Sequence, residues 1–263
     1  MRKILTAFKH SPWYWRIKYS AIGRLLLNLL YPKLAINLQQ EASLFQEAMG
    51  AIKKGFLVFD IGGNVGNNTD LFLKIGAKVV VLEPDKTNVT CPKARFGRNQ
   101  NIHLVQKAVS NQEGTSQLFI EKKGAALHTL STKWKTFLED NDRWNHNVEF
   151  SHSEPVQTTT LSQLIKEFGQ PDFIKIDVEG FEEKVIQGLD RPINQLCFEA
   201  NLPQFTQPTI RSIKMLSDIS KSATFNYSIE EKFELSEYVS PERMIDIVST
   251  TKARYMDIFC KMD

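Results

Sequence analysis

The chain has 263 residues, of which 42% are hydrophobic and 24% are charged, which suits one globular α/β domain with a full core and an appendage. The net charge of +3 is uneven: residues 1–40 hold seven Lys and Arg and no acid, so the other residues carry −4. That negative remainder disfavours nucleic acid as a partner. The three cysteines are odd in number and lack metal-ligand spacing, and with no secretory signal we expect reduced thiols in a cytoplasmic protein.

Residues 1–54 predict a helical N-terminal extension that precedes the main domain. Helices are expected at 2–10, 13–30 and 38–54. Pro32 should stop the second helix and Gly55 should end the third. The third helix carries apolar residues at helical spacing, so we expect it to cover the ligand-binding end of a sheet.

The first 40 residues combine their basic charge with two Trp and three Tyr. This composition suits the headgroup region of an anionic membrane, so peripheral membrane contact through residues 1–40 is one hypothesis. The alternatives are that the apolar run 25–30 packs on the main domain, or that the segment serves nucleic-acid binding or targeting. A spanning helix is excluded, because it needs about 20 apolar residues and Arg24, Asn28 and Lys33 interrupt the run.

Strands and helices alternate from residue 57 onward. The predicted strands lie at 57–61, 78–82, 102–106, 173–176 and 193–198, and the helices at 67–75, 86–97, 161–168, 181–188 and 207–220. A β-α-β series of this kind predicts a mostly parallel sheet with helices on both faces. Two last strands, near 223–228 and 254–260, are expected to close its edge as an antiparallel pair. Ligands bind at the carboxyl ends of such strands.

The loop after the first strand reads Asp60-Ile61-Gly62-Gly63-Asn64-Val65-Gly66. It is not a dinucleotide fingerprint, because Asn64 and Asn67 stand where the second and third glycines are needed, and no phosphate-loop Lys follows. Asp60 at the strand end would repel a pyrophosphate and attract an ammonium. S-adenosylmethionine (SAM) carries an ammonium, a sulfonium and no phosphate, so its charge fits this loop.

A second acid, Glu83, closes the next strand. An acid about 20 residues after the loop, at the end of the second strand, can accept both hydroxyls of a ribose. Strand ends often carry acids for structural reasons. The combination of Asp60, the glycine loop and Glu83 favours a nucleoside cofactor site over that purely structural interpretation.

The sequence resembles the FkbM-type methyltransferases. The resemblance is carried, in the family's order, by Val58–Gly66, Val81–Pro84, Ala108–Ser110 and above all by Ile174–Glu182, and it covers roughly residues 50 to 260. It implies a Rossmann-like class I methyltransferase fold with a mostly parallel seven-stranded sheet, over residues 55–263, and SAM as the cofactor. The segment before Ala108 lies near the adenine in that family, so Gln106 or Lys107 is expected to contact the base. The predicted cofactor residues are Asp60, Gly62, Asn64, Gly66, Asn67, Glu83, Pro84, Gln106, Ala108 and Asp177.

Methyl transfer to an oxygen needs an aligned nucleophile and a base for its proton. The strand-end acid Asp177 is the first candidate, and Glu179 could orient a substrate hydroxyl. Acids also favour the first turn of a helix, so Glu182 is expected to be a capping acid. His128 is the preferred histidine, because it lies nearest the strands that border the site. A metal alternative would use Asp177, Glu199 and Asn201 as oxygen ligands for Mg²⁺.

Residues 121–155 interrupt the alternation, since they are polar and irregular but contain aromatic side chains. We expect a substrate-covering cap there, with a loose surface excursion as the alternative. The segments 108–110 and 115–120 flank Asn111-Gln112-Glu113-Gly114, which predicts a hairpin between two strands.

Three functions compete at this stage. The first is an O-methyltransferase acting on a hydroxyl of a sugar, a glycan or a secondary metabolite, in which the hydroxyl and the substrate class come from the resemblance. The second is a nucleic-acid amino-methyltransferase, which Asp177-Val178-Glu179-Gly180 disfavours because such enzymes carry a Pro-Pro-aromatic motif there. The third is a membrane-associated binding protein on an inactive methyltransferase fold, against which Asp60, Glu83 and Asp177 argue.

Overall fold

The computed structural model describes residues 29–30, 32–121, 126–140 and 148–262. The predicted helix 2–10, almost all of the predicted helix 13–30, and most of the segment expected to contact a membrane lie outside the described residues. None of the described helices has both the length and the apolar character needed to cross a bilayer.

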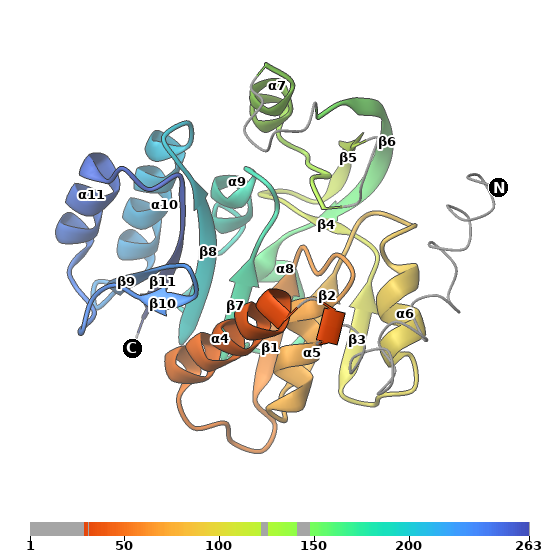
Figure 1. The fold of residues 1–263 in the computed structure, drawn as a ribbon, viewed down its shortest axis with the longest axis horizontal. Coiled ribbons are helices and arrows are strands. Elements are labelled where there is room, and N and C mark those ends of the chain that lie inside the picture. The colour runs from red at the N-terminus through yellow and green to blue at the C-terminus, as the bar shows by residue number, and fades with distance from the viewer. Residues whose placement is uncertain (1–28, 31, 122–125, 141–147, 263) are drawn as a thin grey trace.

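A large sheet forms the centre of the molecule, with the strand order β10-β9-β11-β8-β7-β1-β2-β3 (Figure 1). Its strands are β1 (Leu57–Ile61), β2 (Lys78–Leu82), β3 (Ile102–Val105), β7 (Phe173–Ile176), β8 (Gln195–Asn201), β9 (Thr224–Ile229), β10 (Lys232–Phe233) and β11 (Tyr255–Lys261). The strands from β3 to β8 pair in parallel, and β11, β9 and β10 continue the sheet antiparallel. The predicted mostly parallel sheet is confirmed. The eighth strand, β10, has two residues and no sequence signal of its own.

Helices cover both faces of this sheet, as the alternation predicts. They are α4 (Pro32–Met49), α5 (Asn67–Lys74), α6 (Thr90–Phe96), α8 (Leu161–Phe168), α9 (Glu182–Ile186), α10 (Thr206–Ile219) and α11 (Pro241–Thr250). Side chains alternate across each strand, so Val58 belongs to the apolar cluster that includes residues of α4 and α5, and Phe59 belongs to the cluster on the other face, which includes residues of α8 to α11. Thr160 caps α8 as predicted, since its Oγ1 accepts from Gln163 N at 3.1 Å.

The helix α4 begins and ends earlier than predicted. Its described bounds begin at Pro32 and residues 29–30 are helical as well, so helical residues stand on both sides of the position that the sequence interpretation had made a stop signal. It ends at Met49, and Gly50 follows with a left-handed φ of 66°. Its residues Leu44 and Phe45 belong to the apolar cluster beneath the sheet, so α4 packs directly on the domain.

A second, three-stranded sheet rises above the carboxyl ends of the central strands (Figure 1). It consists of β4 (Ala108–Val109), β5 (Gly114–Glu121) and β6 (Phe150–Thr159) in the order β4-β6-β5, and α7 (Thr132–Asp140) joins β5 to β6. We call this unit, residues 106–159, the inserted module.

Two predictions for this region are wrong. The segments 108–110 and 115–120 do not form a hairpin with each other, because β6 lies between them and pairs with both. The stretch 121–155 is not irregular, since it holds α7 and the first half of β6. Most side chains of β6 are polar and at least partly exposed, so hydrogen bonds to neighbouring strands stabilise it without the apolar alternation that reveals a strand in a sequence.

Candidate functional site

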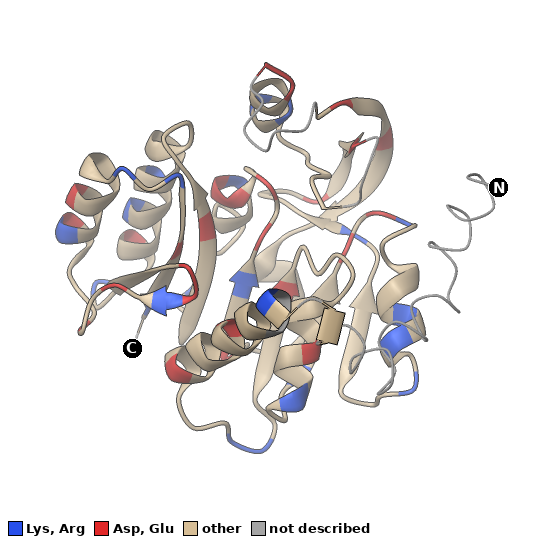
Figure 2. Cartoon of the chain, in the orientation of Figure 1, with Lys and Arg blue, Asp and Glu red and all other residues tan. Residues whose placement is uncertain are grey.

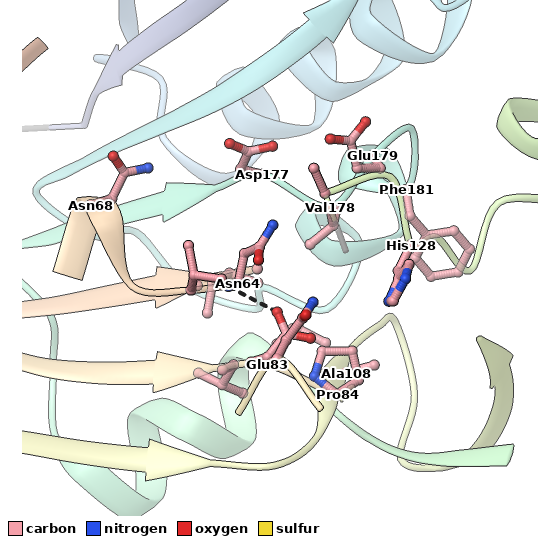
Figure 3. A pocket seen from close by; sticks show the side chains of 18 of the residues that line it. Asn64, Asn68, Glu83, Pro84, Ala108, His128, Asp177, Val178, Glu179 and Phe181 are labelled. Carbon is pink, nitrogen blue, oxygen red and sulfur yellow. Dashed lines mark hydrogen bonds between the residues drawn. The ribbon is translucent and has the colours of Figure 1, made fainter. Parts of the chain in front are cut away.

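A cavity of about 300 Å³ opens at the carboxyl ends of β1, β2 and β7, beneath the inserted module (Figure 3). Its described lining includes the acids Glu41, Glu83, Asp177 and Glu179 and a single lysine, Lys107. Figure 2 shows acidic positions on the loops that rise from these strands. Because acidic side chains outnumber basic ones in this lining, its composition suits a cationic ligand.

The glycine loop after β1 crosses the base of the cavity. The N–H groups of Gly62 and Gly63 both donate to the Leu82 carbonyl at 2.9 Å, which fastens the loop to β2. Gly62 has a φ of 85°, and a Cβ placed on it would lie 1.8 Å from the Asp177 carbonyl oxygen. A residue without a side chain is therefore needed at Gly62 so that the loop can lie against the end of β7.

Asp60 lies beneath this loop and not in the cavity wall. It is 1% exposed, it accepts a short hydrogen bond from the Thr69 hydroxyl, and it is not among the residues that line the cavity. Burial raises the pKa of Asp60 to about 6, although the bond from Thr69 opposes that rise. This placement differs from the expectation that its carboxylate meets the ligand directly.

Glu83 is held at the end of β2 by main-chain donors. Its Oε2 accepts from Asn64 N and its Oε1 accepts from Asp85 N, each at 2.8 Å, and its carboxyl group faces the cavity (Figure 3). Burial raises the pKa of Glu83 to about 7, and the two backbone hydrogen bonds work against that rise. Glu83 therefore lies in the cavity wall at the end of β2, the position that the spacing from the glycine loop predicts.

Asp177 ends β7 on the opposite side of the cavity from Glu83 (Figure 3). Its side chain is 36% exposed, and its Oδ2 lies 3.7 Å from the Nζ of Lys175. Lys175 is buried and pairs more closely with Asp257, at 2.9 Å. Burial raises the pKa of Asp177, and the charge of Lys175 opposes it.

Glu179 is positioned by the inserted module. The Nε1 of Trp134 donates to its carboxylate at 3.0 Å, and the Thr129 hydroxyl donates to its carbonyl at 2.6 Å. Its own backbone is left-handed, with a φ of 55°, which a non-glycine residue keeps only where neighbours impose it. Burial, followed by the charges of Glu199 and Asp177, holds the pKa of Glu179 well above its ordinary value.

Glu182 confirms the capping interpretation. Its Oε1 accepts from Val178 N at 3.2 Å and from Gly180 N at 3.1 Å, which closes the turn between β7 and α9. Burial raises its pKa to about 7.

His128 lines the cavity on the side of Phe181, at the far end of Figure 3 from Asn68. Its Nδ1 lies 3.7 Å from the Asp85 carboxylate. Pro84 and Ala108 line the cavity as predicted, and so does Lys107. Gln106 does not: it lines a separate shallow hollow with Lys86, so of the two residues proposed for base contact only Lys107 faces the cavity.

Of the remaining residues predicted in the loop, some line the cavity and one does not. Asn64 and Asn67 line the cavity, whereas Gly66 lies behind it, where a Cβ would approach the ring of Phe96 to 2.8 Å. Asn68, which the sequence interpretation passed over, also lines the cavity, and its Oδ1 is buried without a hydrogen-bond partner among the described residues.

The three oxygen ligands of the metal alternative do not meet in one cavity. Asp177 lines the cavity described above, whereas Glu199 lines a neighbouring one between α7, α9 and α10 and accepts from Asn201 Nδ2 at 2.6 Å. Within the described part of the chain, no group of three or more His, Cys, Asp and Glu residues has a metal-holding arrangement.

Sequence reasoning missed Glu41, Trp134 and Thr129. Glu41 had a signal, because it falls one turn before Leu44 and Phe45 on the apolar stripe of its helix. Trp134 had only its residue type, since nothing in the spacing connects it with Glu179, 45 residues away in the chain.

The strand order and the cavity at the carboxyl ends of β1, β2 and β7 define a class I SAM-dependent methyltransferase fold. The family model described as the methyltransferase FkbM domain matches residues 60–234, which is more than half of the chain. The chain belongs to the FkbM methyltransferase family.

Among solved structures, the chain is similar to a ribosomal protein L11 methylase from Lactobacillus delbrueckii subsp. bulgaricus, with 14% identity, 86% of this chain and 79% of that chain covered, and a TM-score of 0.43. It is also similar to a precorrin-6Y C5,15-methyltransferase from Geobacter metallireducens, with 10% identity, 86% of this chain and 85% of that chain covered, and a TM-score of 0.41. A third similar structure is an rRNA methylase from Streptococcus thermophilus, with 8% identity, 86% of this chain and 94% of that chain covered, and a TM-score of 0.42. Since these TM-scores lie below 0.5, the assignment depends on the family match and the sheet order. A search of curated proteins found no significant match.

Proposed function

We propose that this protein transfers the methyl group of SAM to a hydroxyl of a sugar, a glycan or a secondary metabolite. The observation that carries the proposal is the pair of differently held carboxyl groups at the cavity, Glu83 on the β2 side and Glu179 on the β7 side. The first suits a ribose and the second suits an acceptor hydroxyl.

The cavity fits SAM by its chemistry. Glu83 would accept the ribose hydroxyls, and the loop residues Gly62 and Asn64 would lie along the nucleoside. The side lined by Pro84, Ala108 and His128 would hold the adenine. Four carboxylates against one lysine in the described lining complement a ligand that carries a sulfonium and an ammonium.

When bound, SAM supplies a methyl group whose bond to sulfur breaks as the bond to the acceptor oxygen forms, and the sulfur keeps the electron pair. The hydroxyl proton needs an acceptor, and we assign Glu179 to that role. A base works best when its pKa lies near the working pH, and burial moves the pKa of Glu179 upward from its ordinary value. Asp177, paired with Lys175, would stay nearer the charged cofactor.

The test begins with binding. Thermal unfolding and calorimetric titration with SAM and with S-adenosylhomocysteine should show a raised melting temperature and a saturable heat, because a ligand that binds only the folded state stabilises it. A screen of cell extract with labelled methyl groups should then find an O-methylated product. Binding without any product would favour the alternative of a binding protein on an inactive fold, and a product methylated at nitrogen or carbon would overturn the choice of hydroxyl.

A cytoplasmic location and peripheral membrane contact through residues 1–40 belong to the same proposal. The basic and aromatic composition of that segment supports the membrane contact, and the three free cysteines support the location. Sedimentation of the protein with anionic vesicles, compared with neutral vesicles, tests the membrane contact.

A further inference from the structure

Glu41 is a carboxylate on the inward face of a helix. It lies on α4 one turn before Leu44 and Phe45, which are 4% and 2% exposed in the apolar cluster beneath the sheet. Residues three and four apart share a face of a helix, so this position would ordinarily take an apolar residue. Glu41 instead lines the cofactor cavity, from an element that precedes the region matched by the family model.

The surroundings of Glu41 hold more negative than positive charge. The positive charge of Lys175 lowers the pKa of Glu41, but Lys175 is already paired with Asp257 at 2.9 Å and with Asp177 at 3.7 Å. Within the described residues, neither a hydrogen bond nor an ion pair joins Glu41 to a partner. Burial raises its pKa to about 7, and the charges of Asp257, Glu231 and Asp177 add to that rise. A carboxylate kept in such a place costs stability unless a cation compensates it.

Because Asp60 does not line the cavity, the ammonium of SAM needs another carboxylate as its partner. The sequence interpretation assigned the ammonium of SAM to Asp60, but its carboxylate lies beneath the glycine loop and accepts from Thr69. Glu83 is engaged by two main-chain amides on the other side of the cavity. Apart from Glu83 and from Glu179, which accepts from Trp134, the described carboxylates that line the cavity are Glu41 and Asp177, and the charge of Asp177 acts on Glu41.

We propose that Glu41, together with Asp177, binds the ammonium of the methionyl part of SAM. The assignment rests on SAM binding as proposed above. This contact would make α4 a part of the cofactor site, and it would explain why an acid occupies the apolar stripe of that helix. Asn68 lies on the same side of the cavity as Asp177 (Figure 3), and its buried Oδ1, which has no partner among the described residues, can accept a hydrogen bond from the same ammonium.

The binding of three ligands can distinguish the contact between Glu41 and the ammonium from the other contacts of the site. SAM and S-adenosylhomocysteine both carry the ammonium, whereas 5′-methylthioadenosine keeps the nucleoside and the sulfur but lacks the amino acid. Isothermal titration calorimetry on the full chain would compare the wild type, Glu41→Gln, and the control Glu47→Gln. Glu47 lies on the same helix but is exposed and outside the cavity lining.

We expect Glu41→Gln to weaken SAM and S-adenosylhomocysteine about tenfold, the size of one charge-assisted hydrogen bond, and to leave 5′-methylthioadenosine within about twofold. Glu47→Gln should leave all three unchanged. In the absence of ligand, Glu41→Gln should melt no lower than the wild type, because it removes an uncompensated charge. Glu41→Asp, which keeps the charge on a shorter side chain, should lie between the wild type and Glu41→Gln.

Two results would overturn the assignment while leaving SAM binding intact: equal affinities of Glu41→Gln and Glu47→Gln for SAM, or an equal loss for 5′-methylthioadenosine, which would mean general damage to the cavity. A wild-type protein that bound none of the three ligands would overturn the proposed function and this assignment with it.

Discussion

The two sides of the cavity hold their carboxylates in different ways. On the β2 side, Glu83 is fixed by the N–H groups of Asn64 and Asp85, which belong to its own and the neighbouring strand–loop unit. On the β7 side, Glu179 is fixed by Trp134 and Thr129, which come from the inserted module. Main-chain donors are present whatever the side chains are, whereas the β7 side depends on particular residues. We infer that the cofactor side is set by the fold and the acceptor side by the module.

Gly62 connects the two sides, so replacing it should have the largest effect. In Gly62→Ala the new Cβ would meet the Asp177 carbonyl oxygen at 1.8 Å, and neither backbone can move without disturbing the sheet. We expect a loss of at least about 3 kcal/mol in the free energy of unfolding, measured by urea denaturation.

The matched control is Gly76→Ala, which has a similar φ of 94° but no atom within 4 Å of the added Cβ. It should lose about 1 to 2 kcal/mol from backbone strain alone. Equal losses in the two variants would show that the contact between the loop and β7 contributes nothing beyond the conformation of the glycine.

Glu83→Gln tests the side held by the main chain. The amide can accept only one of the two N–H bonds, and its NH₂ group would face the other donor, so the side chain should turn away from the ribose position. We expect the affinity for SAM and for 5′-methylthioadenosine to fall by about tenfold to a hundredfold. The equal loss for both ligands distinguishes this acid from Glu41.

Glu113→Gln, an exposed change at the turn before β5, is the control for Glu83→Gln and should leave both affinities unchanged. A Glu83→Gln protein that bound both ligands like the wild type would remove Glu83 from the cofactor site.

Trp134→Phe tests the side held by the module. Phe fills most of the same space beside Phe137 and Phe205 but removes the donor to Glu179. With the acceptor found by the labelled-methyl screen, kcat should fall about tenfold, while SAM affinity stays within about twofold. Since the Trp134 bond lowers the pKa of Glu179, its loss should also move the rising limb of the pH–rate profile to higher pH.

Phe137→Leu is the companion variant, because it disturbs the packing of the Trp134 ring and keeps the indole donor. It should leave the pH–rate profile in place. The same displacement of the profile in both variants would assign the effect to packing and would remove Trp134 as a positioning residue.

The two sides also differ in how far the sequence reveals them. The strands β1, β2 and β7 were predicted to the residue, since buried parallel strands are apolar runs that end in an acid or glycine. Glu83 follows from its spacing alone. The contact of Trp134 with Glu179 could not be predicted, because it needs the path of β6 through the inserted module, and β6 is a polar strand with no alternation. Asp60 was placed near the end of β1, where the structure has it, but the sequence does not show that its carboxylate accepts from Thr69 beneath the glycine loop.

The pH dependence of stability tests the buried carboxyl groups of both sides together. Burial raises the pKa of Glu83 and of Glu182 from 4.5 to about 7, and that of Asp60 from 3.8 to about 6. In the unfolded chain these groups lose their protons near their ordinary pKa values, whereas in the folded protein they keep them to higher pH. The folded state therefore holds more protons in between, so stability should fall as the pH rises from about 4 to about 7 and then level off.

Melting temperatures measured across this range should decline, since each unit by which burial raises a pKa corresponds to about 1.4 kcal/mol of stability that is lost once the group has ionised. Glu83→Gln should flatten part of that decline because it removes one of the titrating groups, and Glu113→Gln should not. A stability that rises with pH over the same range would mean that these carboxyl groups are ionised and compensated in the folded protein, which would contradict burial as the cause of their raised pKa values.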